Sequence, residues 1–102
     1  MNRYALAAFT LASIFSTAAH ADVKLAQTKN CMACHAVDKK VIGPAFKEVA
    51  SKYRSQKGAE DQLVQKVLKG STGVWGGMSM PPNTTVNPKE AQTLVKWILT
   101  QK

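Results

Sequence analysis

The sequence predicts an all-α fold with about four helices. Four stretches carry apolar residues at helical spacing, and there are no convincing strands. Residues 22–102, the part expected to fold, comprise 81 residues and have room for one domain. A domain this small buries little surface, so it usually needs a disulfide, a metal or a cofactor to stabilise it.

Three helices are expected before residue 70. Asp22 can cap the first, which continues to about Asn30. Gly43 and Pro44 open a second segment, whose apolar residues recur at helical spacing: Phe46, Val49, Ala50 and Tyr53. The third helix covers about residues 59–69 and stops at the glycine that follows.

The fourth helix has the clearest start signal. Asn87 is its expected N-cap, Pro88 takes the first turn, and Glu90 completes a capping box. Its apolar face comprises Ala91, Leu94, Val95, Ile98 and Leu99.

A long loop is predicted over residues 71–86, which are rich in glycine, proline, serine and threonine. Loops of this length in small domains are usually functional or disordered. Trp75, Met78 and Met80 favour a functional loop here.

Residues 1–21 are expected to be a cleaved signal peptide. Asn2 and Arg3 provide a positive start, residues 4–15 are mostly apolar, and Ala19-His20-Ala21 is a small-x-small cleavage site. The apolar run is too short for a transmembrane helix, and no second run follows, so no membrane segment is expected in the mature chain. A retained anchor is the alternative if cleavage fails.

The motif Cys31-Met32-Ala33-Cys34-His35 has the C-x-x-C-H spacing of covalent haem attachment. On one helical turn both thiols share a face, and the adjacent imidazole can then bind iron as the proximal ligand. Since His20 leaves with the leader, His35 is the only histidine of the mature chain. Ligation by two histidines is therefore excluded.

Two other uses of the cysteine pair are weaker. A thioredoxin-like redox disulfide expects a surrounding βαβ pattern, which is missing from this sequence. A structural zinc site needs four ligands, and the chain has only two cysteines with one nearby histidine.

A haem iron with one histidine ligand has a sixth position to fill, for which a methionine thioether is suitable. Met32 lies inside the attachment motif and cannot reach the far face of the haem. Two methionines in the long loop remain as candidates, Met78 and Met80.

Taken together, these residues resemble the small bacterial cytochromes c of the c-551 type, also called c-552 or c8. The resemblance covers essentially all of residues 22–102. It lies in five runs that occur in the order and spacing of that family: Lys29-Asn30-Cys31-Met32-Ala33-Cys34-His35, Val41-Ile42-Gly43-Pro44-Ala45, Gly73-Val74-Trp75-Gly76, Met80-Pro81-Pro82-Asn83 and Glu90-Ala91-Gln92-Thr93-Leu94-Val95-Lys96-Trp97-Ile98-Leu99.

The resemblance implies a class I cytochrome c fold and a periplasmic, monomeric electron carrier that is not an enzyme. Its redox partners would be a membrane respiratory complex as donor and a terminal reductase, oxidase or peroxidase as acceptor. Its cofactor would be one haem c with iron. The residues implied at the haem are Cys31 and Cys34 for attachment, His35 and Met80 as iron ligands, Pro44 as hydrogen-bond acceptor for the histidine, Trp75 at a propionate and Asn83 near the axial sulfur. A core aromatic is the alternative for Trp75.

The loop before the expected ligand departs from the Pro-x-Pro-Met of the family. Here it reads Gly77-Met78-Ser79-Met80, without either proline. Proline restricts the unfolded chain, so this loop is predicted to be looser than in relatives. Proline at both positions should stiffen it, provided that the backbone has the φ angle that proline needs.

The mature chain would carry thirteen basic and six acidic residues, a formal charge of +7 with His35 neutral. This charge suits acidic protein or membrane surfaces, whereas export and the lack of a recognition motif argue against nucleic acid. Two alternatives to electron transfer remain. One is a haem that binds small ligands or acts as a peroxidase, although no second histidine is available, and the other is a haem-free protein with a Cys31–Cys34 disulfide.

Overall fold

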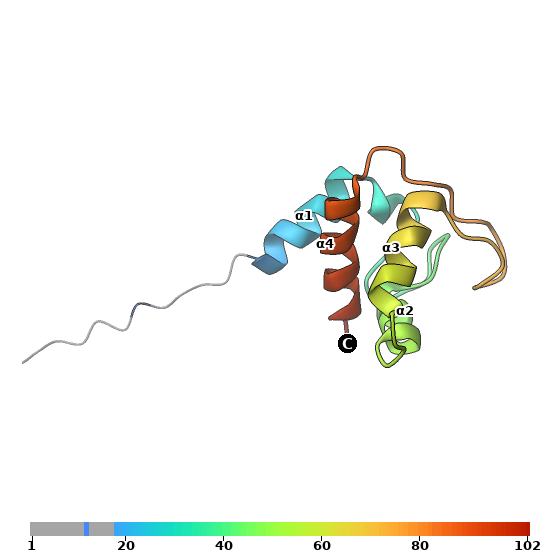
Figure 1. Cartoon of the computed structure of the whole chain (residues 1–102), viewed down its shortest axis with the longest axis horizontal. Coiled ribbons are helices and arrows are strands. Elements are labelled where there is room, and N and C mark those ends of the chain that lie inside the picture. The colour runs from blue at the N-terminus through green and yellow to red at the C-terminus, as the bar shows by residue number, and fades with distance from the viewer. Residues whose placement is uncertain (1–11, 13–17) are drawn as a thin grey trace, which may run out of the picture.

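The computed structural model describes residue 12 and residues 18–102. Within these residues the fold is all-α, as predicted, with no strand beyond two isolated bridges. Figure 1 shows the helices in chain order. Their bounds are α1 Ala18–Thr28, the 3-10 helix η1 Cys31–Ala33, α2 Phe46–Tyr53, α3 Ala59–Lys69 and α4 Pro88–Leu99.

The C-terminal helix α4 is the centre of the fold, and it packs against α1, α2 and α3 (Figure 1). Its buried residues are Ala91, Leu94, Val95, Trp97 and Ile98. Leu94 and Val95 are the largest fully buried side chains among the described residues. Burying one such side chain contributes about 1.5–3 kcal/mol, so α4 supplies much of the hydrophobic core.

The predicted capping box is present at the start of α4. The Asn87 side chain accepts a hydrogen bond from the Glu90 backbone N–H at 2.8 Å, and the Glu90 carboxylate accepts one from the Asn87 N–H at 3.1 Å. Lys29 adds an ion pair to Glu90 at 3.3 Å and donates to the Thr85 carbonyl. The end of α1 is thereby tied to the start of α4.

The start of α1 differs from the sequence prediction. The helix begins at Ala18 rather than at Asp22, so Asp22 does not cap it. Alanine is the strongest helix former, and three alanines in the four residues before Asp22 extend the helix toward the N-terminus. The helix ends at Thr28, because Asn30 takes the left-handed conformation with φ 65°. Most of the expected leader, residues 1–11 and 13–17, lies outside the described residues.

The second and third helices lie where the sequence predicts them. The apolar residues predicted for α2 are all buried, and α3 ends before Gly70. Gly70 has φ 84°, and a Cβ atom there would lie 2.6 Å from the Met80 carbonyl oxygen. Only glycine allows this close approach.

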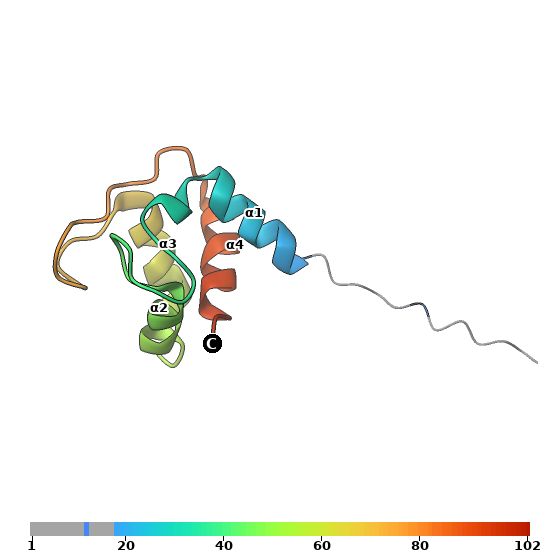
Figure 2. The same cartoon turned by 180° about the vertical axis from the view of Figure 1, so that it is seen from behind.

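Residues 71–86 form the predicted long loop. Ser71 and Met80 exchange two backbone hydrogen bonds, at 2.9 and 3.0 Å, which close the loop at its base. Figures 1 and 2 show the loop extending to one side of α3 before it returns to α4. Among the described residues, no helix is long and apolar enough to span a bilayer.

Candidate functional site

One cavity of about 350 Å³ brings the predicted site residues together. This volume is within the range of about 300–1,000 Å³ that is typical of ligand pockets. The lining is mostly apolar. It comes from η1, α2, α3, α4 and two loops, residues 34–45 and residues 71–86. It includes all seven predicted residues: Cys31, Cys34, His35, Pro44, Trp75, Met80 and Asn83.

The cysteine motif forms a tight turn at the cavity wall. Cys31 begins η1, and its carbonyl accepts backbone hydrogen bonds from Cys34 and His35 at 3.2 and 3.1 Å. Both thiols are free and partly buried. Burial raises the pKa of the Cys31 thiol above its ordinary value, which favours the protonated thiol. A raised pKa is the opposite of what an attacking redox thiolate requires.

The His35 ring has a fixed protonation pattern. Its Nδ1 lies 2.8 Å from the Pro44 carbonyl oxygen, which can only accept a hydrogen bond. Nδ1 therefore carries the proton, and Nε2 keeps its lone pair for a metal. A carbonyl acceptor of this kind orients a ligating imidazole and makes it more basic.

Two further neighbours of His35 were not found from the sequence. Phe46 stacks on the imidazole, with 4.9 Å between ring centroids and 19° between ring planes. A Cβ atom at Gly43 would lie 2.5 Å from Cε1 of the ring. The short segment from Gly43 to Phe46 therefore surrounds the histidine by a hydrogen bond, a stacked ring and a close backbone approach. The resemblance to the family implied the hydrogen bond between His35 and Pro44, but no spacing in the sequence predicts the stacked Phe46 ring.

The two candidate methionines occupy different parts of the loop. The Met80 backbone is held by its pair of hydrogen bonds to Ser71, and its side chain is partly buried. Met78 also lines the cavity, but 77% of its surface is exposed. Met80 is therefore the better held of the two thioethers.

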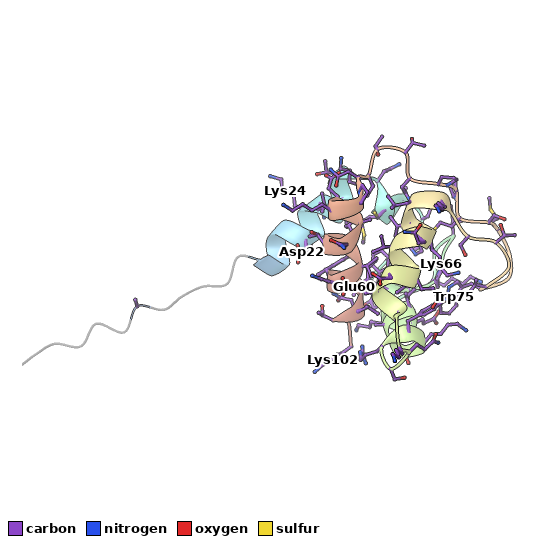
Figure 3. All side chains as sticks on the ribbon, viewed as in Figure 1. Asp22, Lys24, Glu60, Lys66, Trp75 and Lys102 are labelled. Carbon is purple, nitrogen blue, oxygen red and sulfur yellow. The ribbon has the colours of Figure 1, made fainter. Side chains whose placement is uncertain are left out.

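Asn83 and Trp75 make contacts that the sequence did not predict. The Asn83 Nδ2 and backbone N–H both donate to the Val67 carbonyl of α3, at 2.9 and 3.1 Å. Trp75 lines the cavity and is 39% exposed. Its ring lies 5.4 Å from the Lys52 Nζ, within cation–π distance. Figure 3 places it on the side of α3 away from α4.

The charges around the cavity favour an anionic group. Three lysines contribute to the lining, Lys29, Lys40 and Lys66, against one acidic residue, Glu48. Among the residues that the structure describes, no three His, Cys, Asp or Glu side chains are grouped to hold a metal ion, which leaves the zinc alternative without support. An apolar slot with an imidazole, a thioether, two thiols and a basic rim fits a haem.

Comparisons with known proteins show to which family the chain belongs. The family model described as Cytochrome c matches residues 22–102. Cytochrome c-551 of Pseudomonas aeruginosa is 55% identical over 78 residues, which is 76% of this chain and 74% of that protein. Cytochrome c-552 of Nitrosomonas europaea is 49% identical over 82% of both chains.

The fold gives the same result. The crystal structure of Nitrosomonas europaea cytochrome c552 superposes with a TM-score of 0.76 and 48% identity, over 78% of this chain and 99% of that one. The class 1 cytochrome MtoD of Sideroxydans lithotrophicus superposes with a TM-score of 0.68 and 36% identity, over 80% of this chain and 94% of that one. By sequence and by fold, the chain belongs to the cytochrome c family and is a small electron-carrier protein with one covalently bound haem c.

Proposed function

We propose that the chain is a periplasmic electron carrier in which His35 and Met80 are the two axial ligands of the haem iron. The observation that carries this proposal is the His35–Pro44 hydrogen bond, which leaves Nε2 free to bind a metal at the wall of the shared cavity. Met80 lines the same cavity and is held at its backbone by Ser71. With His35 and Met80 as ligands, the iron would have no open position for a substrate.

Cys31 and Cys34 would attach the cofactor. Each thiol would supply the sulfur of one thioether bond to a haem vinyl group, and its proton would go to the second vinyl carbon, so that no external oxidant or reductant is required. Because Cys31 is partly buried and its thiol pKa is raised, the thiolate is disfavoured, so we expect attachment to need a maturation system.

The remaining residues would tune electron transfer. When bound, the haem supplies one-electron chemistry at its iron. The Met80 thioether favours the reduced metal, whereas the basic imidazole of His35 favours the oxidised one. Asn83 keeps a second Nδ2 hydrogen that could reach the Met80 sulfur, and the Trp75 indole N–H could bind a propionate. With a haem in place, the apolar lining of the cavity would limit the access of water to its iron.

Export and partners complete the proposal. We infer that residues 1–21 are removed on export to the periplasm, which would remove the first turn of α1. The mature chain would act as a monomer between a membrane respiratory complex and a terminal reductase, oxidase or peroxidase. Its positive charge would bring it to acidic partner surfaces.

Haem retention tests the attachment. Protein produced with a cytochrome c maturation system should keep its haem through acid–acetone extraction, because thioether bonds survive that treatment. The variant Cys31→Ala/Cys34→Ala should release it under the same conditions. Free extraction from the wild-type protein would refute covalent attachment.

The axial methionine is tested by two matched variants. In the oxidised wild-type protein, a methionine–iron charge-transfer band is expected in the far-red spectrum. Met80→Ala should abolish this band, whereas Met78→Leu should leave it in place because the Met78 side chain is largely exposed. The reverse pattern would assign the ligand to Met78.

A further inference from the structure

Phe46 lies between the proposed iron ligand and the core of the protein. It is the first residue of α2, and only 3% of its surface is exposed. One of its neighbours is the His35 imidazole, stacked at 4.9 Å and 19°. Another is Trp97 of α4, whose ring meets it edge-on at 5.4 Å and 77°. Both distances are within the range of attractive aromatic pairs.

The hydrogen bond to Pro44 does not define the orientation of the imidazole completely. It restrains the direction of the Nδ1–H bond, whereas a small rotation of the ring about that direction would leave the hydrogen bond intact. A flat surface against one face of the ring removes this rotation. Phe46 supplies such a surface, and its own ring is held by the contact with α4.

We propose that Phe46 is a positioning residue for the His35 imidazole, which sets the plane of the ring and shields its hydrogen bond to Pro44 from water. This inference rests on the proposed function, in which His35 is an axial ligand. Through Trp97, Phe46 and His35, the orientation of the ligand is coupled to the packing of α2 on α4. Loss of the aromatic face would let the imidazole turn and water reach Nδ1.

The test uses the holoprotein and the variant Phe46→Leu, which keeps an apolar side chain but loses the flat face. In the oxidised state, the paramagnetic NMR shifts of the His35 ring protons should move, because they depend on the ring plane. In the reduced state, the His35 Nδ1–H should exchange with water roughly tenfold faster or more, because local opening becomes easier. Phe46→Tyr keeps a stacked ring and should restore both signals.

Val64→Ala is the matched control. Val64 is buried in α3 and does not line the cavity, so its truncation should lower stability without changing either His35 signal. If Phe46→Leu fails to hold haem, the same two measurements are made on Phe46→Met, whose flexible side chain fills more of the space but also lacks a flat face. Unchanged shifts and exchange in a folded Phe46 variant would overturn the inference. An absence of paramagnetically shifted His35 signals in the wild-type protein would instead overturn the proposed ligation.

Discussion

Gly43 leaves no room for a side chain beside the His35 ring. A Cβ atom there would lie 2.5 Å from Cε1, 2.9 Å from Nδ1 and 3.0 Å from Nε2 of His35. Because three ring atoms are affected together, the imidazole would have to move and strain its bond to the Pro44 carbonyl. Forcing an extra methyl group into a packed site of this kind typically lowers the free energy of unfolding by about 1–3 kcal/mol.

We therefore predict that Gly43→Ala lowers the stability of the holoprotein by about 1–3 kcal/mol and shifts its reduction potential. Denaturant titration and voltammetry measure the two effects. Gly58→Ala is the control, since Gly58 has φ 76° but open space around its Cβ position. It should lose stability through backbone strain and keep the wild-type potential. Equal potentials in all three proteins would mean that Gly43 does not restrain the ligand.

The structure changes the expectation for the loop prolines. Gly77 has φ 61°, which proline cannot adopt, so the condition for a stabilising Gly77→Pro change is not met. Ser79 is not among the described residues with positive φ, and its N–H has no backbone partner in the described part of the chain. Of the two positions, the backbone therefore excludes proline at 77 and does not exclude it at 79.

Ser79→Pro is predicted to raise the unfolding free energy by about 0.4–1 kcal/mol, because it restricts the unfolded chain. It should also raise the pH midpoint at which the methionine–iron band disappears, since a stiffer loop releases Met80 less easily. Gly77→Pro should lower both quantities. Thermal melts and an alkaline spectral titration measure the effects. A lower melting temperature for Ser79→Pro would show that the backbone at position 79 does not accept proline.

At the scale of the elements, the junction between α1 and α4 depends on an ionised carboxylate. The hydrogen bond from the Asn87 N–H lowers the pKa of Glu90 below its ordinary value, and Lys29 lowers it further. A carboxyl group with a lower pKa in the folded state stabilises the protein at pH values above its unfolded pKa. That contribution is lost as the pH falls through the folded pKa.

Glu90→Gln is therefore predicted to be less stable than the wild-type protein at neutral pH, with a difference that shrinks under acid conditions. Glutamine can still accept the hydrogen bond from Asn87, so the variant isolates the effect of the charge. Chemical denaturation at a series of pH values measures it. Lys29→Met should show a smaller effect with the same pH trend, and a difference independent of pH would exclude the ionic contribution.

The sequence was a good guide where a signal is local. The capping box at Asn87, the glycine that follows α3 and the apolar period of α2 each act within a few residues, and all three predicted their helices. The first helix was misplaced because Asp22 is a good cap only where a helix starts, whereas the alanines before it continue the helix.

The site was predictable to a different extent. The C-x-x-C-H motif is local and carries its own chemistry, whereas the choice of Met80 came from the resemblance to a family. The contacts of Phe46, Trp75 and Asn83 depend on how distant segments pack, so no spacing in the sequence encodes them. The positive φ angle of Gly77 could not be predicted from the sequence either, since glycine allows either sign of φ.

At the scale of the whole molecule, exposed apolar residues and lysines lie in or beside the lining of the cavity. The exposed large apolar residues among those described lie in the two loops that contribute to the cavity, residues 34–45 and 71–86. They are Val41, Ile42, Val74, Trp75 and Met78. The lysines in the lining add positive charge to this face. Apolar contact would favour close docking of a redox partner, whereas the charge would steer an acidic partner toward it.

Steering predicts a dependence on ionic strength. The bimolecular electron-transfer rate with an acidic partner protein should fall as salt rises, since ions screen exposed charges beyond about 10 Å at 0.1 M. Lys40→Gln should lower the rate at low salt and weaken its salt dependence, because Lys40 lines the cavity. Lys57→Gln removes the same charge from the turn between α2 and α3, outside the lining, and should change the rate less. Stopped-flow measurements over a range of salt concentrations distinguish these cases. Equal effects of the two variants would mean that net charge alone attracts the partner, and a rate independent of salt would mean that the apolar residues govern docking.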